Sequence, residues 1–319
     1  MECIICKRDF PEDQFVPEHV FPESIGGSFI LNNAVCENCN HLLGSKVDSL
    51  LINNFLTVMK RCRFKIKNKK GEVPTFYGTG TLDSNPNQKI LWDSDKNGTP
   101  INLHLYPQID CKVINENQVE VNVSADASYG EEKILDMVTK KMERMGRKIS
   151  KEELKKQMGP LNPKKMQSPT IQFQDKINTL EYKAAIVKII YEMAHYWLGN
   201  QYLIDETGEK FRCFLHDIIH KNISVLECMD KYGLNGKAEI VNDKTEILGH
   251  KNCHYVIIFQ QRNRILCHLN IFDLFKATIP LTYNASNYTD FKNKCLILNY
   301  TNNSYIECPI TYNAIAEII

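Results

Sequence analysis

The chain has 319 residues, 43 % of them hydrophobic and 24 % charged, which is typical of a soluble globular protein. At about 150 residues per domain, this length predicts two domains. No apolar run reaches the ~18–20 residues that span a bilayer, and a net charge of +1 indicates no partner by itself. The N-terminus MECIICKRDF has a cysteine pair where a secretory signal needs a basic stretch and an apolar core. We therefore expect a cytoplasmic protein with reduced thiols.

The first forty residues contain two Cys-x2-Cys pairs, Cys3 with Cys6 and Cys36 with Cys39. Such a pair sits in a tight turn and directs two thiolates at one tetrahedral zinc ion, so two pairs complete a structural zinc site. The pairs are 29 residues apart, more than the ~15–20 of common zinc ribbons. The zinc is therefore expected to close a larger loop. The remaining cysteines stand singly, mostly among apolar neighbours, and are expected in the core: Cys62, Cys111, Cys213, Cys228, Cys253, Cys267, Cys295 and Cys308.

The loop between the pairs reads as strand, turn, strand and helix. It contains Glu18-His19-Val20 between two prolines, then Gly26-Gly27, then Asn33, and it leads into Cys36-x2-Cys39-Asn40-x3-Gly44. This pattern, over about residues 3–48, resembles the HNH or ββα-metal (His-Me finger) endonuclease family in a zinc-stapled, four-cysteine form. The resemblance implies a β-hairpin packed on a helix, with one catalytic divalent ion between them.

The resemblance also implies roles for four residues. His19 stands at the position of the general base, and Asn33 at that of the asparagine that helps to fix the histidine. Glu18 and Asn40 stand at the ligand positions of a catalytic Mg²⁺ or Mn²⁺ ion. A hard divalent ion stabilises the charge of the phosphodiester transition state and prefers oxygen ligands. An imidazole with a pKa near 6.5 suits a base at neutral pH. The implied products are a 5′-phosphate and a 3′-hydroxyl.

Three features depart from the commonest family pattern. Glu18 stands where aspartate is commoner, and Asn40 where many members have histidine. The adjacent His41 is an alternative ligand if the register shifts by one residue. Glu18 and His19 would face opposite sides of a regular strand, so both can reach one ion only where the chain is irregular.

A helix is expected over roughly Asn40 to Phe55, followed by a basic segment. From Lys60 to Lys70 seven of eleven residues are basic, and they alternate with apolar residues. This alternation predicts a half-buried strand with one basic face, which could neutralise phosphates. The candidate nucleic-acid contacts are Lys60, Arg61, Arg63, Lys65 and Lys67. A second basic stretch, Lys140 to Lys165, fits a solvated helix face equally well.

The middle of the chain is expected to form short strands and two helices. Turn clusters separate candidate strands at Phe76–Leu82, Ile90–Trp92, Ile101–Tyr106 and Val119–Val123. A charged helix is predicted over Glu131–Met145, and a shorter one after Ser150, which forms a capping box with Glu153. Prolines between residues 159 and 169 indicate a loop, and a subdomain break is placed near 159–178.

The last part of the chain is expected to contain one long helix and a β meander. Asn178 or Thr179 caps the helix Leu180–Leu198, and His195 on its apolar face is interpreted as structural. The predicted strands are Tyr255–Gln260, Arg264–Asn270, Ala277–Leu281, Cys295–Tyr300 and Tyr305–Cys308. His250, His254 and His268 match no compact ligand spacing, so no second metal site is predicted there.

The predicted fold is α+β, with the zinc-stapled nuclease motif at 1–58 and a mixed α+β body at 59–319. The body has a central helix and a C-terminal antiparallel meander, and it could set specificity, form a homo-oligomer or regulate the nuclease. We predict a metal-dependent DNA endonuclease, and by analogy with other HNH effectors a bacterial antiviral defence protein. The partners expected are DNA and a regulatory protein from a neighbouring gene. The alternatives are a zinc-dependent nucleic-acid-binding or adaptor protein without catalysis, and an RNA-directed nuclease.

Overall fold

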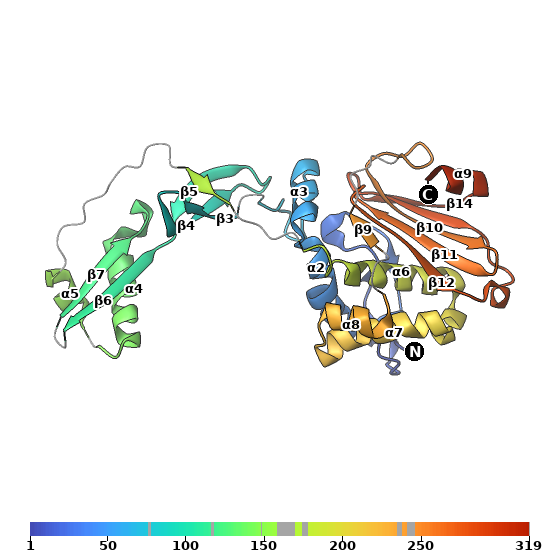
Figure 1. Cartoon of the computed structure of the whole chain (residues 1–319), viewed down its shortest axis with the longest axis horizontal. Coiled ribbons are helices and arrows are strands. Elements are labelled where there is room, and N and C mark those ends of the chain that lie inside the picture. The colour runs from blue at the N-terminus through green and yellow to red at the C-terminus, as the bar shows by residue number, and fades with distance from the viewer. Residues whose placement is uncertain are drawn as a thin grey trace. The chain divides into compact units, whose positions relative to one another are not determined.

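The computed structural model describes residues 1–75, 78–115, 118–147, 149–157, 170–173, 178–234, 238–240 and 246–318. The chain forms two compact units, one of Met1–Pro74 with Lys176–Ile319 and one of Thr75–Asp175 (Figure 1). The second unit is thus an insertion between two segments that fold together. Neither of its limits coincides with the predicted domain boundary at residue 58, because the nuclease motif shares its core with the C-terminal part of the chain.

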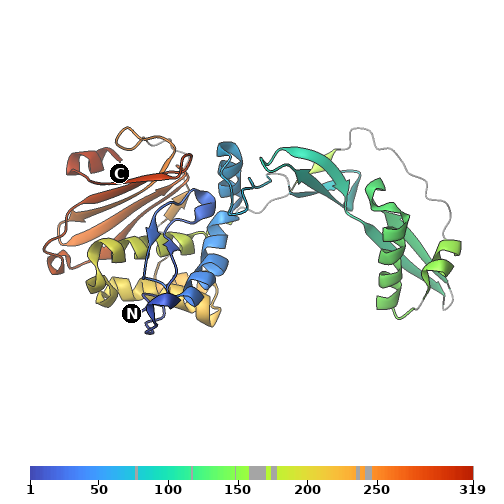
Figure 2. The same ribbon diagram turned by 180° about the vertical axis from the view of Figure 1, so that it is seen from behind.

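The N-terminal motif has the predicted β-hairpin and helix. Strand β1 (Glu18–His19) pairs antiparallel with β2 (Ile30–Leu31), so that His19 lies opposite Ile30. The helical part has three α-helical segments and one π-helical turn: α1 (Glu37–Leu43), the π turn η3 (Gly44–Asp48), α2 (Ser49–Ile52) and α3 (Phe55–Phe64). Seen from behind, the hairpin lies beside helix α6 (Lys183–Leu198) (Figure 2).

The strand predicted over Lys60–Lys70 is wrong, because Lys60–Phe64 belong to helix α3 and the residues that follow form turns and irregular chain. The side chain of Asn54 caps the helix by accepting a hydrogen bond from the N–H of Leu56, at 3.1 Å. Lys65, with φ of 56°, ends it in the left-handed conformation. Leucine, methionine, lysine and arginine are good helix formers, and together with the cap they outweigh the short alternation that indicated a strand.

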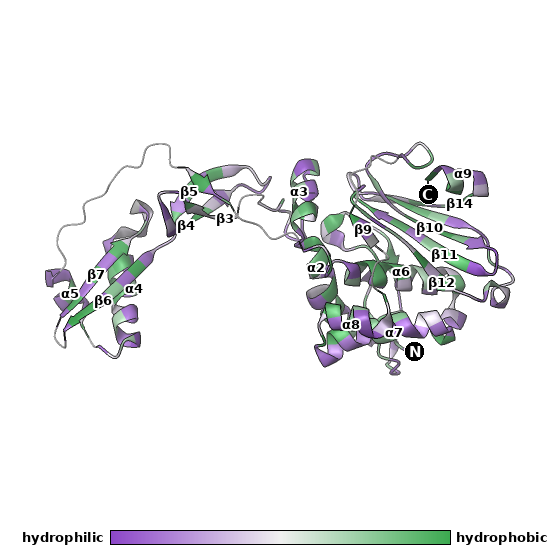
Figure 3. Ribbon diagram, viewed as in Figure 1, coloured by the Kyte–Doolittle hydropathy of each residue, from purple (hydrophilic) through white to green (hydrophobic). Residues whose placement is uncertain are grey.

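A six-stranded antiparallel sheet forms the C-terminal part of the first unit, in the order β14-β13-β10-β11-β12-β9. Its strands are β9 (Ala238–Ile240), β10 (Cys253–Gln261), β11 (Arg264–Ile271), β12 (Phe275–Thr282), β13 (Lys294–Asn299) and β14 (Ser304–Pro309). The predicted C-terminal antiparallel sheet is therefore confirmed, but it is not a simple meander, because β13 pairs with β10 and not with β12. Strands β10 and β11 are buried along most of their length and are mainly apolar (Figure 3). Helix α9 (Tyr312–Ile318) packs on one sheet face through Ile315.

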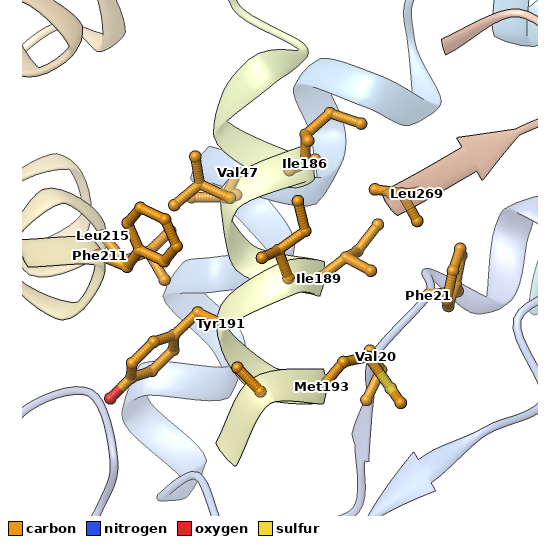
Figure 4. Packing of buried hydrophobic residues seen from close by; sticks show 14 of the residues in the cluster. Val20, Phe21, Val47, Ile186, Ile189, Tyr191, Met193, Phe211, Leu215 and Leu269 are labelled. Atoms are coloured by element: carbon orange, nitrogen blue, oxygen red, sulfur yellow. The ribbon is translucent and has the colours of Figure 1, made fainter. Parts of the chain in front are cut away.

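Helix α6 lies at the centre of the main core. It packs with Val20 and Phe21 of the hairpin, with Val47 of the π turn and with Leu269 of β11 (Figure 4). Helices α7 (Glu206–Lys221) and α8 (Val225–Tyr232) complete this core, and neither was predicted. The core thus joins the nuclease motif to the sheet through one buried helix.

The second unit contains two small sheets and two helices. One sheet has the order β5-β4-β3-β8, and a separate hairpin pairs β6 with β7. The elements are β3 (Thr79–Leu82), β4 (Asn85–Ser94), β5 (Pro100–Leu105), β6 (Gln108–Asn115), β7 (Gln118–Ser124), α4 (Gly130–Arg144), α5 (Lys151–Gln157) and β8 (Ile171–Gln172). The capping box of Ser150 and Glu153 is present, whereas the predicted proline loop lies outside the described residues. None of the helices described has the length and apolar character needed to span a membrane.

Candidate functional site

The four N-terminal cysteines converge on one point. The Sγ atoms of Cys3, Cys6, Cys36 and Cys39 all lie within 4.8 Å of one another. A tetrahedral zinc ion with Zn–S bonds of ~2.3 Å would place its sulfurs about 3.8 Å apart. The N–H of Cys36 points at the Cys3 sulfur, at 3.4 Å, and His220 of α7 places Nε2 3.4 Å from the Cys39 sulfur. The geometry fits a closed structural zinc site.

The thiols of this cluster cannot all ionise side by side without a cation. A hydrogen bond from Cys39 lowers the pKa of Cys3 to about 4, whereas burial raises the pKa of Cys36 to about 11. Zinc requires thiolates, and its charge compensates for their mutual repulsion. The cluster therefore has the donor chemistry of a site that could hold zinc.

Replacing Cys39 with serine is expected to remove the zinc and unfold the N-terminal motif. A structural zinc site contributes directly to folding, and Cys39 is fully buried among its three partners. Metal analysis should find about one zinc per wild-type chain and far less in the variant, together with a lower melting temperature. Cys308→Ser, at a half-buried cysteine outside the cluster, is the matched control. Equal zinc contents in Cys39→Ser and wild type would contradict the assignment.

His19 is partly exposed and its ring is oriented by the backbone. Its Nδ1 lies 3.2 Å from the carbonyl oxygen of Gly27, and its Nε2 lies 3.9 Å from Oε2 of Glu23. An Nδ1–H that donates to the carbonyl leaves the lone pair on Nε2, which is the state that a general base needs. The side chain is 27 % exposed, so part of the imidazole side chain is open to solvent.

Asn33 does not take the orienting role that the sequence predicted for it. It lies beyond β2, has a positive φ of 59°, and donates a hydrogen bond to Glu12 at 3.3 Å. The group beside Nδ1 of His19 is instead the carbonyl of Gly27. Every residue has a backbone carbonyl, so residue types could not indicate that the carbonyl of Gly27 would lie beside the His19 ring.

Glu18 and Asn40, the predicted metal ligands, do lie together. Nδ2 of Asn40 donates to Oε2 of Glu18 at 2.6 Å and to the carbonyl of Pro17 at 3.3 Å. The neighbouring His41 is exposed, and it is Asn40 that reaches Glu18. The regular pairing of β1 turns Glu18 inward while His19 stays partly exposed, so the irregular backbone that the sequence suggested is not present.

Both oxygens of the Glu18 carboxylate already have a protein donor. Its side chain is only 4 % exposed, and Oε1 lies 2.5 Å from Nζ of Lys188 while Oε2 accepts from Asn40. Magnesium keeps several of its waters when bound to protein, so an ion at Glu18 would have to take the place of Lys188 or Asn40 beside the carboxylate. In this arrangement the cation next to Glu18 is the ammonium group of Lys188.

Lys188 belongs to a buried ionic cluster that was not predicted. Its Nζ also lies 3.4 Å from Oδ2 of Asp48 and 3.4 Å from Oε2 of Glu192. Burial raises the pKa of Asp48 to about 6 and raises that of Glu192 well above its usual value. Burial opposes the charge on Lys188, but Asp48, Glu18 and Glu192 raise the pKa of its ammonium overall. In the sequence, this cluster was indicated only by a lysine and a glutamate four residues apart in an otherwise apolar helix.

The basic segment comes close to the histidine. Nζ of Lys69 lies 3.6 Å from Oε2 of Glu23, the same oxygen that faces Nε2 of His19. Of the predicted contacts, Arg61 is only 5 % exposed, and this excludes it from a surface role. Lys60 is half-buried, and Arg63, Lys65 and Lys67 are exposed.

His254 and His268, two other histidines considered from the sequence, have hydrogen-bond partners within the protein. His254 is buried between the carbonyl of Ile25, 2.9 Å from Nε2, and the N–H of Phe272, 3.1 Å from Nδ1. Nδ1 of His268 lies 2.8 Å from the hydroxyl of Thr278. Within the described ranges, the four N-terminal cysteines form the one group of three or more metal-binding side chains.

Comparison with known protein families identifies the N-terminal region. Residues 3–56 match a family model described as HNH endonuclease. No curated protein and no solved structure matches the chain. The matched residues contain the four converging cysteines, the oriented histidine and the hairpin with its helix. The N-terminal region is therefore an HNH endonuclease region of the four-cysteine type, and it supports a nuclease-type function.

Proposed function

We propose that this protein is an endonuclease that hydrolyses phosphodiester bonds of DNA, with His19 as the general base. The observation that carries the proposal is the orientation of His19. The Gly27 carbonyl engages Nδ1, and Nε2 faces the partly exposed side of the hairpin. A base must present an unprotonated nitrogen to the water that it activates, and His19 is placed to do so.

In the proposed reaction, Nε2 of His19 takes a proton from a water molecule as the water oxygen attacks phosphorus. The bond from phosphorus to the 3′ oxygen breaks, which leaves a 5′-phosphate and, after protonation of the leaving oxygen, a 3′-hydroxyl. Hydrogen bonding of Nδ1 to the Gly27 carbonyl stabilises the imidazolium that forms. The groups that hold the substrate are the exposed basic residues beside the histidine.

HNH nucleases use divalent metal ions, which stabilise the charge developing on the phosphate. Mg²⁺ or Mn²⁺ on Glu18 and Asn40 stays our prediction from the sequence, although Glu18 is engaged by Lys188 and Asn40. Titration of the zinc-loaded protein with Mn²⁺, followed by electron paramagnetic resonance, tests it directly. Tight binding that Asn40→Ala abolishes would support the ligand assignment, and unchanged binding in that variant would exclude it.

Exposed basic residues support a nucleic-acid substrate. Lys65, Lys67 and Lys69 are exposed, and Lys69 reaches the Glu23 carboxylate beside His19. A phosphate that approaches Nε2 of His19 would thus enter the field of this segment. The Glu23 carboxylate lies between Lys69 and His19, where a substrate phosphate would make a similar pair of contacts.

Replacing Lys65, Lys67 and Lys69 together with alanine is expected to weaken DNA binding, mostly at low salt. Each lost phosphate contact lowers the slope of log K against log salt by about 0.9 for duplex DNA. Fluorescence anisotropy over a salt series measures this slope. Lys251→Ala is the matched control, since Lys251 is an exposed lysine paired with Glu246 at 3.2 Å. A slope equal to that of wild type would exclude the segment as a DNA contact.

Cleavage of supercoiled plasmid tests the proposed function, with Mg²⁺, with Mn²⁺ and with neither added. RNA of matched sequence is the competing substrate. Conversion of plasmid to nicked or linear DNA supports the proposal, and cleavage of RNA alone would favour the RNA-directed alternative. Binding without cleavage under every ion would favour the zinc-dependent adaptor. The role in antiviral defence rests on analogy and stays a prediction.

A further inference from the structure

A lysine from a distant part of the chain reaches into the nuclease hairpin. Lys188 stands on helix α6, 169 residues after His19, and it is fully buried. Its Nζ lies 2.7 Å from the backbone carbonyl oxygen of His19 and 3.3 Å from that of Val20. The same atom lies 2.5 Å from the Glu18 carboxylate. An ammonium group has three donors, and these three acceptors come from consecutive residues of the hairpin.

The contact fixes the backbone of the proposed base. Strand β1 is only two residues long, and the hairpin continues beyond it through a hydrogen bond from the N–H of Val20 to the carbonyl of Phe29, at 3.2 Å. The ammonium group of Lys188 contacts the backbone carbonyl of His19, and the carbonyl of Gly27 contacts the His19 ring. With both its backbone and its ring held in this way, the imidazole has a defined direction.

Two further carboxylates lie near the ammonium group. Asp48 comes from the π turn that interrupts the helix of the HNH motif, and Glu192 lies one turn along α6 from Lys188. Removing charges from water costs several kcal/mol per ion, so a buried ion pair is weak evidence of a gain in stability. Such a group is better explained by the geometry that it imposes. In this cluster the groups whose positions are fixed are the Glu18 carboxylate and the backbone carbonyl of His19.

We propose that Lys188 is a positioning residue of the nuclease site, which fixes Glu18 and the backbone of His19 from helix α6. The inference rests on the proposed function, because it assigns Lys188 a role in the reaction of His19. It also means that the site is built from two parts of the chain that the inserted unit separates. The HNH motif alone does not contain everything that orients its histidine.

The experiment compares Lys188→Met and Lys188→Arg with wild type in the full-length, zinc-loaded protein. Methionine removes the ammonium, whereas arginine keeps the charge but cannot place one nitrogen within reach of all three acceptors. We expect Lys188→Met to lower kcat about 100-fold, the scale of a 1 Å misplacement of a reacting group. Lys188→Arg should lower it by at least about tenfold, with KM for DNA and zinc content close to wild type.

Two controls separate positioning from general destabilisation. Glu192→Gln alters the same buried cluster, but among the contacts described Glu192 meets the ammonium and not the hairpin. Lys231→Met removes a lysine paired with the buried Asp217, at 2.5 Å, on helix α7. Both should keep kcat near wild type. A kcat near wild type in the folded Lys188 variants would overturn the inference, and so would an equal loss in Glu192→Gln.

Nuclear magnetic resonance of the Lys188 ammonium group tests its contact with the hairpin without a cleavage assay. A buried, hydrogen-bonded ammonium exchanges its protons slowly, so its ¹⁵Nζ resonance should be visible in the wild type and absent in Lys188→Arg. Glu18→Gln should shift this resonance more than Glu192→Gln does. Equal shifts would overturn the inference even if Lys188→Met fails to fold. A chain that cuts no nucleic acid but shows the expected shifts would contradict the proposed function and leave the Lys188 contact established.

Discussion

Replacing His19 with alanine is expected to lower the rate of phosphodiester cleavage about 10²–10⁴-fold, the usual contribution of a general base. The fold should remain, because the side chain is 27 % exposed and its contacts are one carbonyl and one exposed carboxylate. Loss of kcat with DNA affinity and zinc content retained would identify His19 as a group that acts in the reaction. Plasmid cleavage under single-turnover conditions measures this loss.

The matched control is His41→Ala, which removes an exposed histidine from helix α1 in the same motif. Activity near that of wild type is expected, because Asn40 and not His41 contacts Glu18. A loss in His41→Ala similar to that in His19→Ala would favour His41 as the ligand, with the register shifted by one residue. Equal cleavage by wild type and His19→Ala under every metal ion would leave the adaptor function as the better explanation.

The N-terminal motif could be predicted from the sequence because its signals are local. Cysteine spacing identified four ligands, and the structure brings their sulfurs within 4.8 Å of one another. Turn residues and apolar positions likewise indicated the N-terminal hairpin and the strands of the C-terminal sheet. In each case the residues that determine the structure are close in sequence, so their spacing or periodicity predicts it.

The interior of the site could not be predicted, since it depends on contacts between distant segments. Lys188 was one basic residue in an apolar helix, and only the fold shows that Glu18 faces it at 2.5 Å. Gly27 acts through its carbonyl, which every residue type possesses. Helix α7 brings His220 to the cysteine cluster from 181 residues away. A buried charge acquires its partner from the packing of the whole unit, and no periodicity in the chain encodes that partner.

The second large effect is expected at Gly27, where alanine should impair both the fold and the reaction. A Cβ at this position would lie 1.9 Å from the carbonyl oxygen of Phe21 and 2.5 Å from its carbonyl carbon. These are backbone atoms of the segment that follows His19, so the hairpin itself must shift. Overpacking of this kind costs about 1–3 kcal/mol, and a 1 Å displacement of the imidazole costs about 100-fold in rate.

Gly27→Ala should therefore melt at a lower temperature than wild type and cut DNA about 100-fold more slowly even where it is fully folded. Gly44→Ala is the matched control, because a Cβ on Gly44 meets no atom within 4 Å and its backbone is helical. Alanine in a helix is about 0.5–1 kcal/mol more favourable than glycine, so this variant should be at least as stable as wild type and as active. Scanning calorimetry and cleavage assays at a temperature well below both transitions separate the two effects. A Gly27→Ala protein that is less stable but fully active would show that the carbonyl of Gly27 is dispensable for orienting His19, and the direction of the base would then depend on the contact between Lys188 and the strand backbone.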